Sequence, residues 1–178
     1  MADFQNTIDL LGEEAFIKAF VDRIITEFND DVIATVGRSA FSGCSQLTSV
    51  NLPLATSVDG YAFQSCTKLT SIDLPLATSV GSYTFNGCSQ LTYVILRAET
   101  VCTLNNTNAF KNTPFASGKA GGTLLVPRAL VTKYPNATNW SSIFSGNTNN
   151  RVLALEDYTV DGTITGEIDW DKLNGGTT

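Results

Sequence analysis

The chain has 178 residues, enough for one domain with appendages, and its apolar fraction of 43% allows a buried core. A net charge of −6, with 11 Lys and Arg residues that form no cluster, argues against a nucleic-acid partner. The chain contains 0 histidines, which removes the commonest general base and the commonest metal ligand.

Residues 1–31 are predicted to form an N-terminal helical cap. Apolar residues recur along one helical stripe between residues 7 and 28: Leu10, Ile17, Val21, Ile24 and Phe28. The first residues show no basic stretch followed by an apolar run, so we expect no signal peptide. No apolar run is long enough to predict a membrane span. Such a chain is cytoplasmic at synthesis, has lost its signal, or is exported by another route, and its localisation stays open.

Residues 32–127 are predicted to be repeats with a period of about 22 residues. The stretches SAFSGCSQLTSVNLPLATSVDG, YAFQSCTKLTSIDLPLATSVGS and YTFNGCSQLTYVILRAETVCTL align without a gap. Beyond them, after a short insertion, Phe110 takes the phenylalanine place and Thr113 the cysteine place. One unit is too short to bury its own apolar side chains, but stacked units share a continuous core.

Each unit predicts two extended segments and a tight turn. LTSVNLP alternates apolar and polar residues, as a short strand does, and Pro53 ends it. AFxxC predicts one turn of helix, and ATSV a second extended segment. The string LPLATSV occurs at residues 52–58 and again at 74–80. Its leucines and its valine are predicted to face the core.

The remaining chain is predicted to close the stack. Residues 128–157 form an irregular C-terminal cap, with a short helix beginning at Pro127 and a strand in RVLALED. Residues 158–178 form a polar tail that we expect to be loosely packed. In this tail, DYTVDGTITGEID has acidic residues at calcium-loop spacings, but Ile168 stands where a bidentate glutamate is needed. A solvated turn is therefore favoured, and no metal site is predicted.

The four cysteines are predicted to be buried thiols. Cys44, Cys66 and Cys88 are separated by the repeat period, which is not the spacing of a metal-ligand pair. Cys102 is interpreted as a core residue in the place of Val58 and Val80.

Candidate ligand-binding residues lie on the outward face of the predicted strands, where side chains alternate with the inward ones. Tyr93 and Ile95 form either a binding patch or a surface packed against the C-terminal segment, and packing is favoured. The candidates are Ser49, Asn51, Ser71, Asp73, Tyr93 and Ile95, together with Arg97 after the third strand.

The unit V-x-x-x-V-G-x-x-A-F-x-x-C-x-x-L-x-x-V-x-L-P, carried here by VIATVGRSAFSGCSQLTSVNLP, resembles the leucine-rich repeat of BspA-like bacterial surface proteins. The resemblance implies an α/β leucine-rich-repeat solenoid without catalytic residues or cofactors. It further implies adhesion or binding to a protein or glycan through the repeat face or the caps, in a cell-surface, secreted or virion-associated setting. Short arrays of this kind also resemble gut-bacterial and prophage proteins. The alternative is therefore a structural component of a prophage particle that takes no small-molecule ligand.

Overall fold

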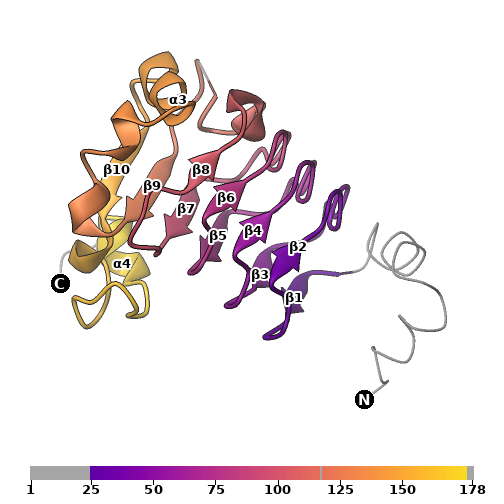
Figure 1. Cartoon of the computed structure of the whole chain (residues 1–178), viewed down its shortest axis with the longest axis horizontal. Helices are drawn as coiled ribbons and strands as arrows, with labels where there is room; N and C mark the ends of the chain where they lie inside the picture. Colours follow the sequence, from indigo (N-terminus) through magenta and orange to yellow (C-terminus); the bar gives the residue numbers. More distant parts are fainter. Residues whose placement is uncertain (1–24, 117, 176–178) are drawn as a thin grey trace.

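The repeats stack as two parallel sheets that flank one core (Figure 1). The computed structural model describes residues 25–116 and 118–175. In this part of the chain, one sheet has the strand order β1-β3-β5-β7-β9-β10 and the other the order β2-β4-β6-β8. The strands are β1 (Glu27–Asn29), β2 (Thr35–Val36), β3 (Ser49–Asn51), β4 (Ser57–Val58), β5 (Ser71–Leu74), β6 (Ser79–Val80), β7 (Tyr93–Leu96), β8 (Thr103–Leu104), β9 (Thr123–Val126) and β10 (Arg151–Ala154).

Among the described residues, the helices are short and lie mostly in the C-terminal third. The 3₁₀ helices are η1 (Thr107–Phe110), η2 (Arg128–Leu130), η3 (Tyr134–Asn136) and η4 (Leu155–Asp157), and the α-helices are α3 (Trp140–Gly146) and α4 (Trp170–Leu173). The predicted short helix after Pro127 is η2, and the predicted strand in RVLALED is β10. No helix among the described residues is long and apolar enough to cross a membrane.

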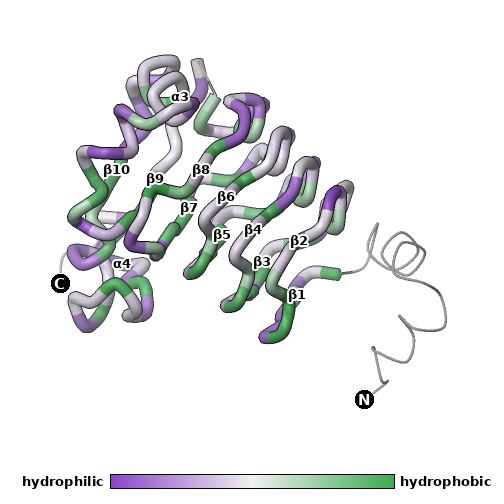
Figure 2. Tube along the Cα trace, viewed as in Figure 1, coloured by the Kyte–Doolittle hydropathy of each residue, from purple (hydrophilic) through white to green (hydrophobic). Residues whose placement is uncertain are grey.

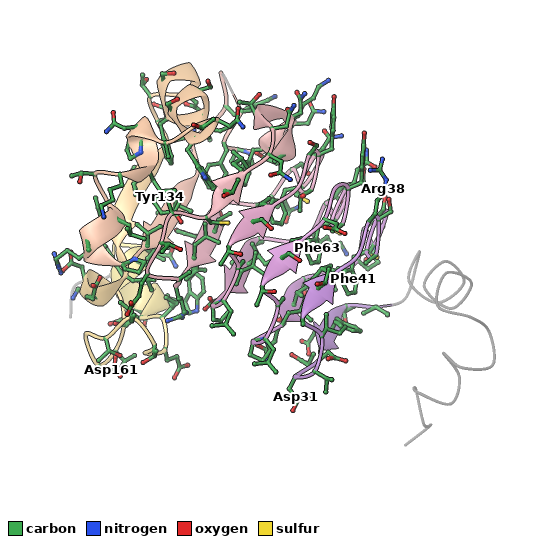
Figure 3. The ribbon with its side chains drawn as sticks, viewed as in Figure 1. Asp31, Arg38, Phe41, Phe63, Tyr134 and Asp161 are labelled. Carbon is green, nitrogen blue, oxygen red and sulfur yellow. The ribbon has the colours of Figure 1, made fainter. Side chains whose placement is uncertain are left out.

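The phenylalanine positions of the repeats form one stack through the core. The ring centroids of Phe41 and Phe63 are 5.1 Å apart, and the two rings are stacked almost parallel, with an interplanar angle of 1°. Phe63 and Phe85 follow at 5.8 Å, and Phe85 and Phe110 at 5.4 Å, so the predicted place of Phe110 is confirmed. Figure 3 shows Phe41 and Phe63 in the interior, and Arg38 and Asp31 at opposite edges of the stack. Each ring covers the next, which is how units too small to fold alone share a core.

The first strand of the sheet begins earlier than expected. Residues 27–29 pair in parallel with β3, and Phe28 lies beside Val50. The helical prediction is therefore wrong for Glu27 and Phe28, because Phe28 precedes Val50 by the repeat spacing and packs as part of the stack. Residues 25, 26 and 29–31 of the predicted cap are not helical either, and residues 1–24 lie outside the described residues.

The AFxxC segments are turns rather than single turns of helix. Ser39, Tyr61 and Tyr83 have φ values of 60°, 63° and 60°, which is left-handed backbone. This conformation aims backbone N–H groups along the stack: Phe41 N donates to Ala62 O at 2.7 Å. Phe63 N donates in the same way to Thr84 O at 2.9 Å. The turns therefore join neighbouring repeats by a third row of hydrogen bonds, beside the two sheets.

The buried cysteines lie next to these turns. The Cys66 thiol donates to Phe41 O at 3.1 Å and the Cys88 thiol to Phe63 O at 3.0 Å, and all four cysteines are buried. The hydrogen bond with Cys44 lowers the pKa of the Cys66 thiol, but the bond with Cys88 and burial raise it, and the net shift of the pKa is upward. The prediction of buried thiols is confirmed.

The place assigned to Cys102 was wrong. Leu104, not Cys102, pairs with Val80, because the chain between β7 and β8 holds two more residues than the corresponding segment of the previous repeat. Cys102 is still fully buried, and burial raises its pKa to about 12.

Candidate functional site

The outer face of the larger sheet changes character along the stack. One line of outward-facing positions crosses five neighbouring strands: Asn29, Asn51, Asp73, Ile95 and Leu125. The first three are polar, and Asn29 and Asn51 are exposed. The last two are apolar and are 1% and 0% exposed. The face thus divides at Asp73 into an open polar part and a covered apolar part.

The C-terminal segment covers the apolar part. Ile95 and Leu125 form a second, smaller hydrophobic cluster with Leu155, Ile168 and Leu173. Figure 1 shows this yellow segment beside β9 and β10, at the end of the stack opposite β1. The expectation of a loosely packed tail is therefore wrong at Ile168 and Leu173, whose side chains pack on apolar outward positions of β7 and β9, while residues 160–163 are exposed. Packing against the C-terminal segment, the favoured reading of Ile95, is confirmed.

Tyr93 also contacts the tail. Its ring lies 5.5 Å from that of Trp170 in an edge-to-face arrangement, and its hydroxyl donates to Asn174 Oδ1 at 2.7 Å. Half-buried by these contacts, Tyr93 is part of the internal surface on which the tail rests. Tyr93 and Ile95 therefore do not form an open binding patch.

Arg97 fastens the tail to the sheet. Its Nη2 lies 2.6 Å from Asp73 Oδ2, and its Nε donates to both carboxylate oxygens. Its Nη1 donates to the backbone oxygens of Ile164 and Gly166 at 2.7 and 2.9 Å. The guanidinium is thus neutralised by Asp73 and occupied by the tail. Arg97 therefore makes contacts within the chain. The carboxylate of Asp73 stays partly exposed.

Ser49, Asn51 and Ser71 lie on the open part of the face, as the alternation of the strands predicted. Ser49 and Asn51 are exposed and Ser71 is half-buried. Glu27 extends this part of the face onto β1, where it is exposed and pairs with Ser49. Of the seven candidates, Ser49 and Asn51 are the exposed ones. Ser71 and Asp73 keep part of their side chains accessible, and the carboxylate of Asp73 also binds Arg97.

Beside the open part runs a row of exposed aliphatic side chains, which we call the aliphatic ridge: Val32, Leu54 and Leu76. They are 78%, 46% and 45% exposed and occupy the same place in three successive repeats, in the loops after β1, β3 and β5. Figure 2 shows these loops in green along one edge of the stack. The ridge was not predicted, because both leucines of LPLATSV were expected to face the core. Leu52 and Leu74 are 0% exposed, but proline ends the alternation and turns the second leucine outward.

A groove lies where the open face meets the tail. It has a volume of about 600 Å³ and contains the exposed indole of Trp170. Its other lining residues are Asp73, Pro75, Arg97, Thr165, Gly166, Glu167 and Ile168. Pro75 precedes Leu76, so the groove continues the aliphatic ridge.

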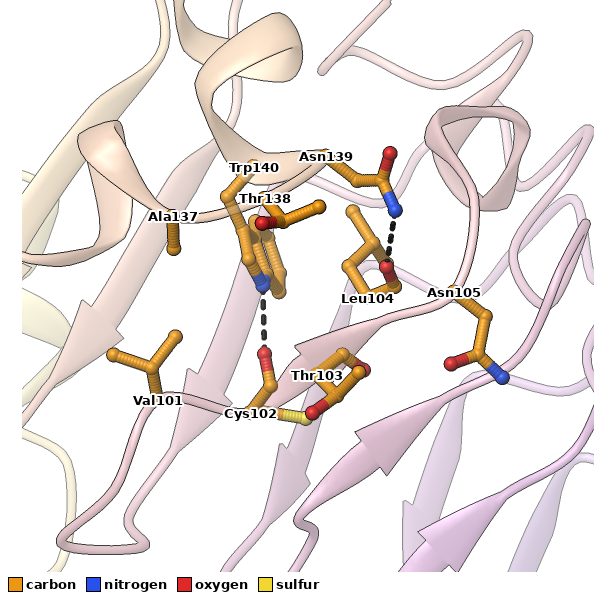
Figure 4. Close-up of a pocket in the computed structure, with 9 residues that line it drawn as sticks. All are labelled: Val101, Cys102, Thr103, Leu104, Asn105, Ala137, Thr138, Asn139 and Trp140. Atoms are coloured by element: carbon orange, nitrogen blue, oxygen red, sulfur yellow. Dashed lines mark hydrogen bonds between the residues drawn. The ribbon is translucent and has the colours of Figure 1, made fainter.

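A second pocket, of about 520 Å³, borders the last strand of the smaller sheet (Figure 4). There the outward backbone groups of β8 are capped by side chains. Trp140 Nε1 donates to Cys102 O at 2.8 Å, and Asn139 Nδ2 donates to Leu104 O at 2.6 Å. Cys102 N donates to the Tyr134 hydroxyl at 3.0 Å. These contacts satisfy backbone groups at the open edge of the smaller sheet.

The acidic loop of the tail is a turn. Asp161 accepts hydrogen bonds from the backbone and the hydroxyl of Thr163, which lower the pKa of its carboxyl group. Among the described residues, no three His, Cys, Asp or Glu side chains are grouped so that they could hold a metal ion.

Stacked parallel strands, repeated leucine positions and a shared phenylalanine core define a leucine-rich-repeat domain. The chain matches the family described as BspA type leucine rich repeat region, with six copies over residues 9–122, and it belongs to that family. The match covers more than half of the chain and begins, like β1, before residue 32. Repeat domains of this family are generally non-catalytic and typically serve in protein interaction. No curated protein matches the chain.

Proposed function

We propose that this chain is a non-enzymatic interaction module that binds a protein through the open part of its larger sheet and the aliphatic ridge. The observation that carries the proposal is the ridge itself. Three large aliphatic side chains stay in water at equivalent places of successive repeats, although the same units bury their other leucines completely. Contiguous exposed apolar surface rimmed by polar residues is characteristic of protein-binding sites. A role in adhesion would use this surface.

The rest of the same face supports a polypeptide as the partner. On β7 and β9 the chain's own C-terminal segment already occupies the outward positions. It places apolar side chains on Ile95 and Leu125 and presents backbone oxygens to Arg97. A partner segment on β1, β3 and β5 would lie beside this tail, with aliphatic contacts at the ridge and hydrogen bonds to Asn51 and Ser49.

Photo-crosslinking tests the proposed surface. A photoreactive residue is placed singly at Leu54 or Leu76, and matched controls carry it at Thr56 or Thr78, which are exposed two residues farther along. After incubation with a lysate of the organism that carries the gene, we expect one common protein adduct at the ridge positions and not at the controls. The double variant Leu54→Ser, Leu76→Ser should lose that partner in pull-downs, because the apolar contact is gone.

Two results would contradict the proposal. Equal crosslinking at ridge and control positions would show that the ridge is not the interface. A ligand that the ridge variant retains, and that is removed by glycan-cleaving enzymes, would show that the chain binds a glycan elsewhere. Circular dichroism of the ridge variant should match that of the unmodified chain, because both leucines are about half exposed.

A further inference from the structure

The groove beside the ridge has an unusual combination of groups. Trp170 is 39% exposed, whereas the other tryptophan of the chain, Trp140, is 1% exposed. Pro75 and Ile168 supply apolar surface next to the indole, and Glu167 supplies an exposed carboxylate. An aromatic ring that remains accessible next to a carboxylate can hold a ligand by its ring face and by charge.

The charged groups that line the groove leave a negative charge unpaired. The guanidinium of Arg97 is paired with Asp73, and its nitrogens donate to that carboxylate and to two backbone oxygens. Glu167 takes part in neither of the two ion pairs found within residues 25–116 and 118–175. The groove therefore presents hydrogen-bond acceptors and one uncompensated carboxylate. A positively charged group that carries hydrogen-bond donors and no acceptors complements this groove.

We propose that this groove anchors a lysine or arginine side chain of the protein that docks on the aliphatic ridge. The proposal rests on the proposed function and adds the chemistry of the partner: cationic residues next to aliphatic ones. The cation lies over the indole of Trp170 and pairs with Glu167, while its methylene stem packs on Pro75 and Ile168. Lysine and arginine carry donors and no acceptors, which matches the groups that the groove offers. A neutral sugar could accept hydrogen bonds from the Trp170 indole or the Thr165 hydroxyl, but it would leave the negative charge of Glu167 uncompensated.

The test uses the full chain and three probes: fluorescein-labelled tetra-arginine amide, the same peptide with citrulline in place of arginine, and N,N′,N″-triacetylchitotriose. Citrulline has the shape of arginine without its charge. We expect tetra-arginine to bind and to change the emission of the chain, which comes from one exposed and one buried tryptophan. Citrulline and the trisaccharide should leave the emission unchanged. Binding should weaken as salt is raised, because the groove is open to solvent.

Variants assign the binding to the groove. Glu167→Gln should weaken tetra-arginine binding about two- to five-fold, as loss of an exposed ion pair does. Asp59→Asn removes the same charge from an exposed site directly after β4 of the other sheet and should have no effect. Trp170→Ala should weaken binding by a similar about two- to five-fold. Because Trp170 also contacts Tyr93, the exposed Glu167 decides the outcome if the Trp170 variant folds poorly.

Equal binding of the citrulline peptide, equal effects of Glu167→Gln and Asp59→Asn, or a response to the trisaccharide in place of tetra-arginine would each overturn the assignment. The ridge variant Leu54→Ser, Leu76→Ser should bind tetra-arginine normally, since the groove is intact. If the groove fails these tests while crosslinking at Leu54 persists, the proposed function stands and only the cation site is lost. If crosslinking at Leu54 fails, the proposed function is wrong whatever tetra-arginine does.

Discussion

Replacing Arg97 by alanine should detach the C-terminal segment from the sheet and leave the repeats folded. The side chain joins Asp73 on β5 to the backbone of Ile164 and Gly166 in the tail. In the wild-type chain these bonds are charge-assisted, and each such bond contributes about 1.5–3 kcal/mol. The variant leaves a carboxylate and two carbonyl groups without their donor.

The expected loss of tail stability is about 2–4 kcal/mol, toward the lower part of the range for breaking a buried ion pair. Arg97 is 11% exposed but Asp73 is 34% exposed, so water can partly replace the lost donor on the carboxylate. The second ion pair, Arg128 with Asp157, is the matched control. Its side chains are 59% and 52% exposed, so water screens the pair and Arg128→Ala should change the stability of the tail far less.

Hydrogen–deuterium exchange measures both effects. In the Arg97 variant, amides in residues 158–175 should exchange about 30- to 1000-fold faster, as expected when local opening becomes easier by that free energy. Amides of β3 and β5 should keep their protection. Unchanged exchange in the tail, or an equal effect of Arg128→Ala, would refute the argument that Arg97 holds the tail. Arg97→Lys should rescue little, because an ammonium cannot reach the carboxylate and both carbonyls in the same fork geometry.

Three further predictions concern the repeats. In LPLATSV, Leu52→Ala should lower the free energy of urea unfolding by about 2–5 kcal/mol, whereas Leu54→Ala should change it by less than about 0.5 kcal/mol, and similar losses would contradict the inward and outward assignment. Gly81→Ala should lower the melting temperature, because its Cβ would lie 2.4 Å from a neighbouring backbone nitrogen, while Gly37→Ala, with nothing within 4 Å, should not. Burial raises the pKa of the Cys102 thiol to about 12, above the ordinary thiol value of 9.0, so its stabilising contribution should be complete below about pH 9 and lost as pH rises toward 12. Urea unfolding at pH 8 and pH 11 measures this loss together with that from Cys66, whose pKa is also raised, and an unchanged midpoint would contradict the prediction.

The repeat core could be predicted from the sequence because identical positions meet identical surroundings in each unit. Phe41, Phe63 and Phe85 recur at the period and are all buried, as are the cysteines that follow them. The outward direction of Ser49 and Asn51 followed from alternation in a strand. Both inferences depend only on local periodicity, and the spacing of equivalent residues in the stack preserves it.

The predictions from the sequence were wrong where the chain leaves its regular strands. Leu54 follows the proline that ends a strand, so the alternation of the strand no longer predicts whether its side chain faces the core or solvent. Leu104 pairs with Val80 only because two added residues are accommodated in the loop before it, and strand pairing alone reveals that shift. The AFxxC segments were predicted to be helical. Instead, Tyr61 and Tyr83 adopt left-handed backbone, and N–H groups of the segment donate to the neighbouring repeat.

By itself, the sequence determined the stacked architecture, its core and the outward strand positions, since each of these repeats with the unit. Only the tertiary structure decided which outward positions remain available to a partner. The tail is polar and glycine-rich, and nothing in its local pattern indicates that Ile168 and Leu173 pack on Ile95 and Leu125. That contact joins segments more than 40 residues apart. It lies beside the hydrogen bonds that Arg97 donates to two carbonyl groups of the tail. Burial by a distant segment is a property of the folded chain and not of any window of its sequence.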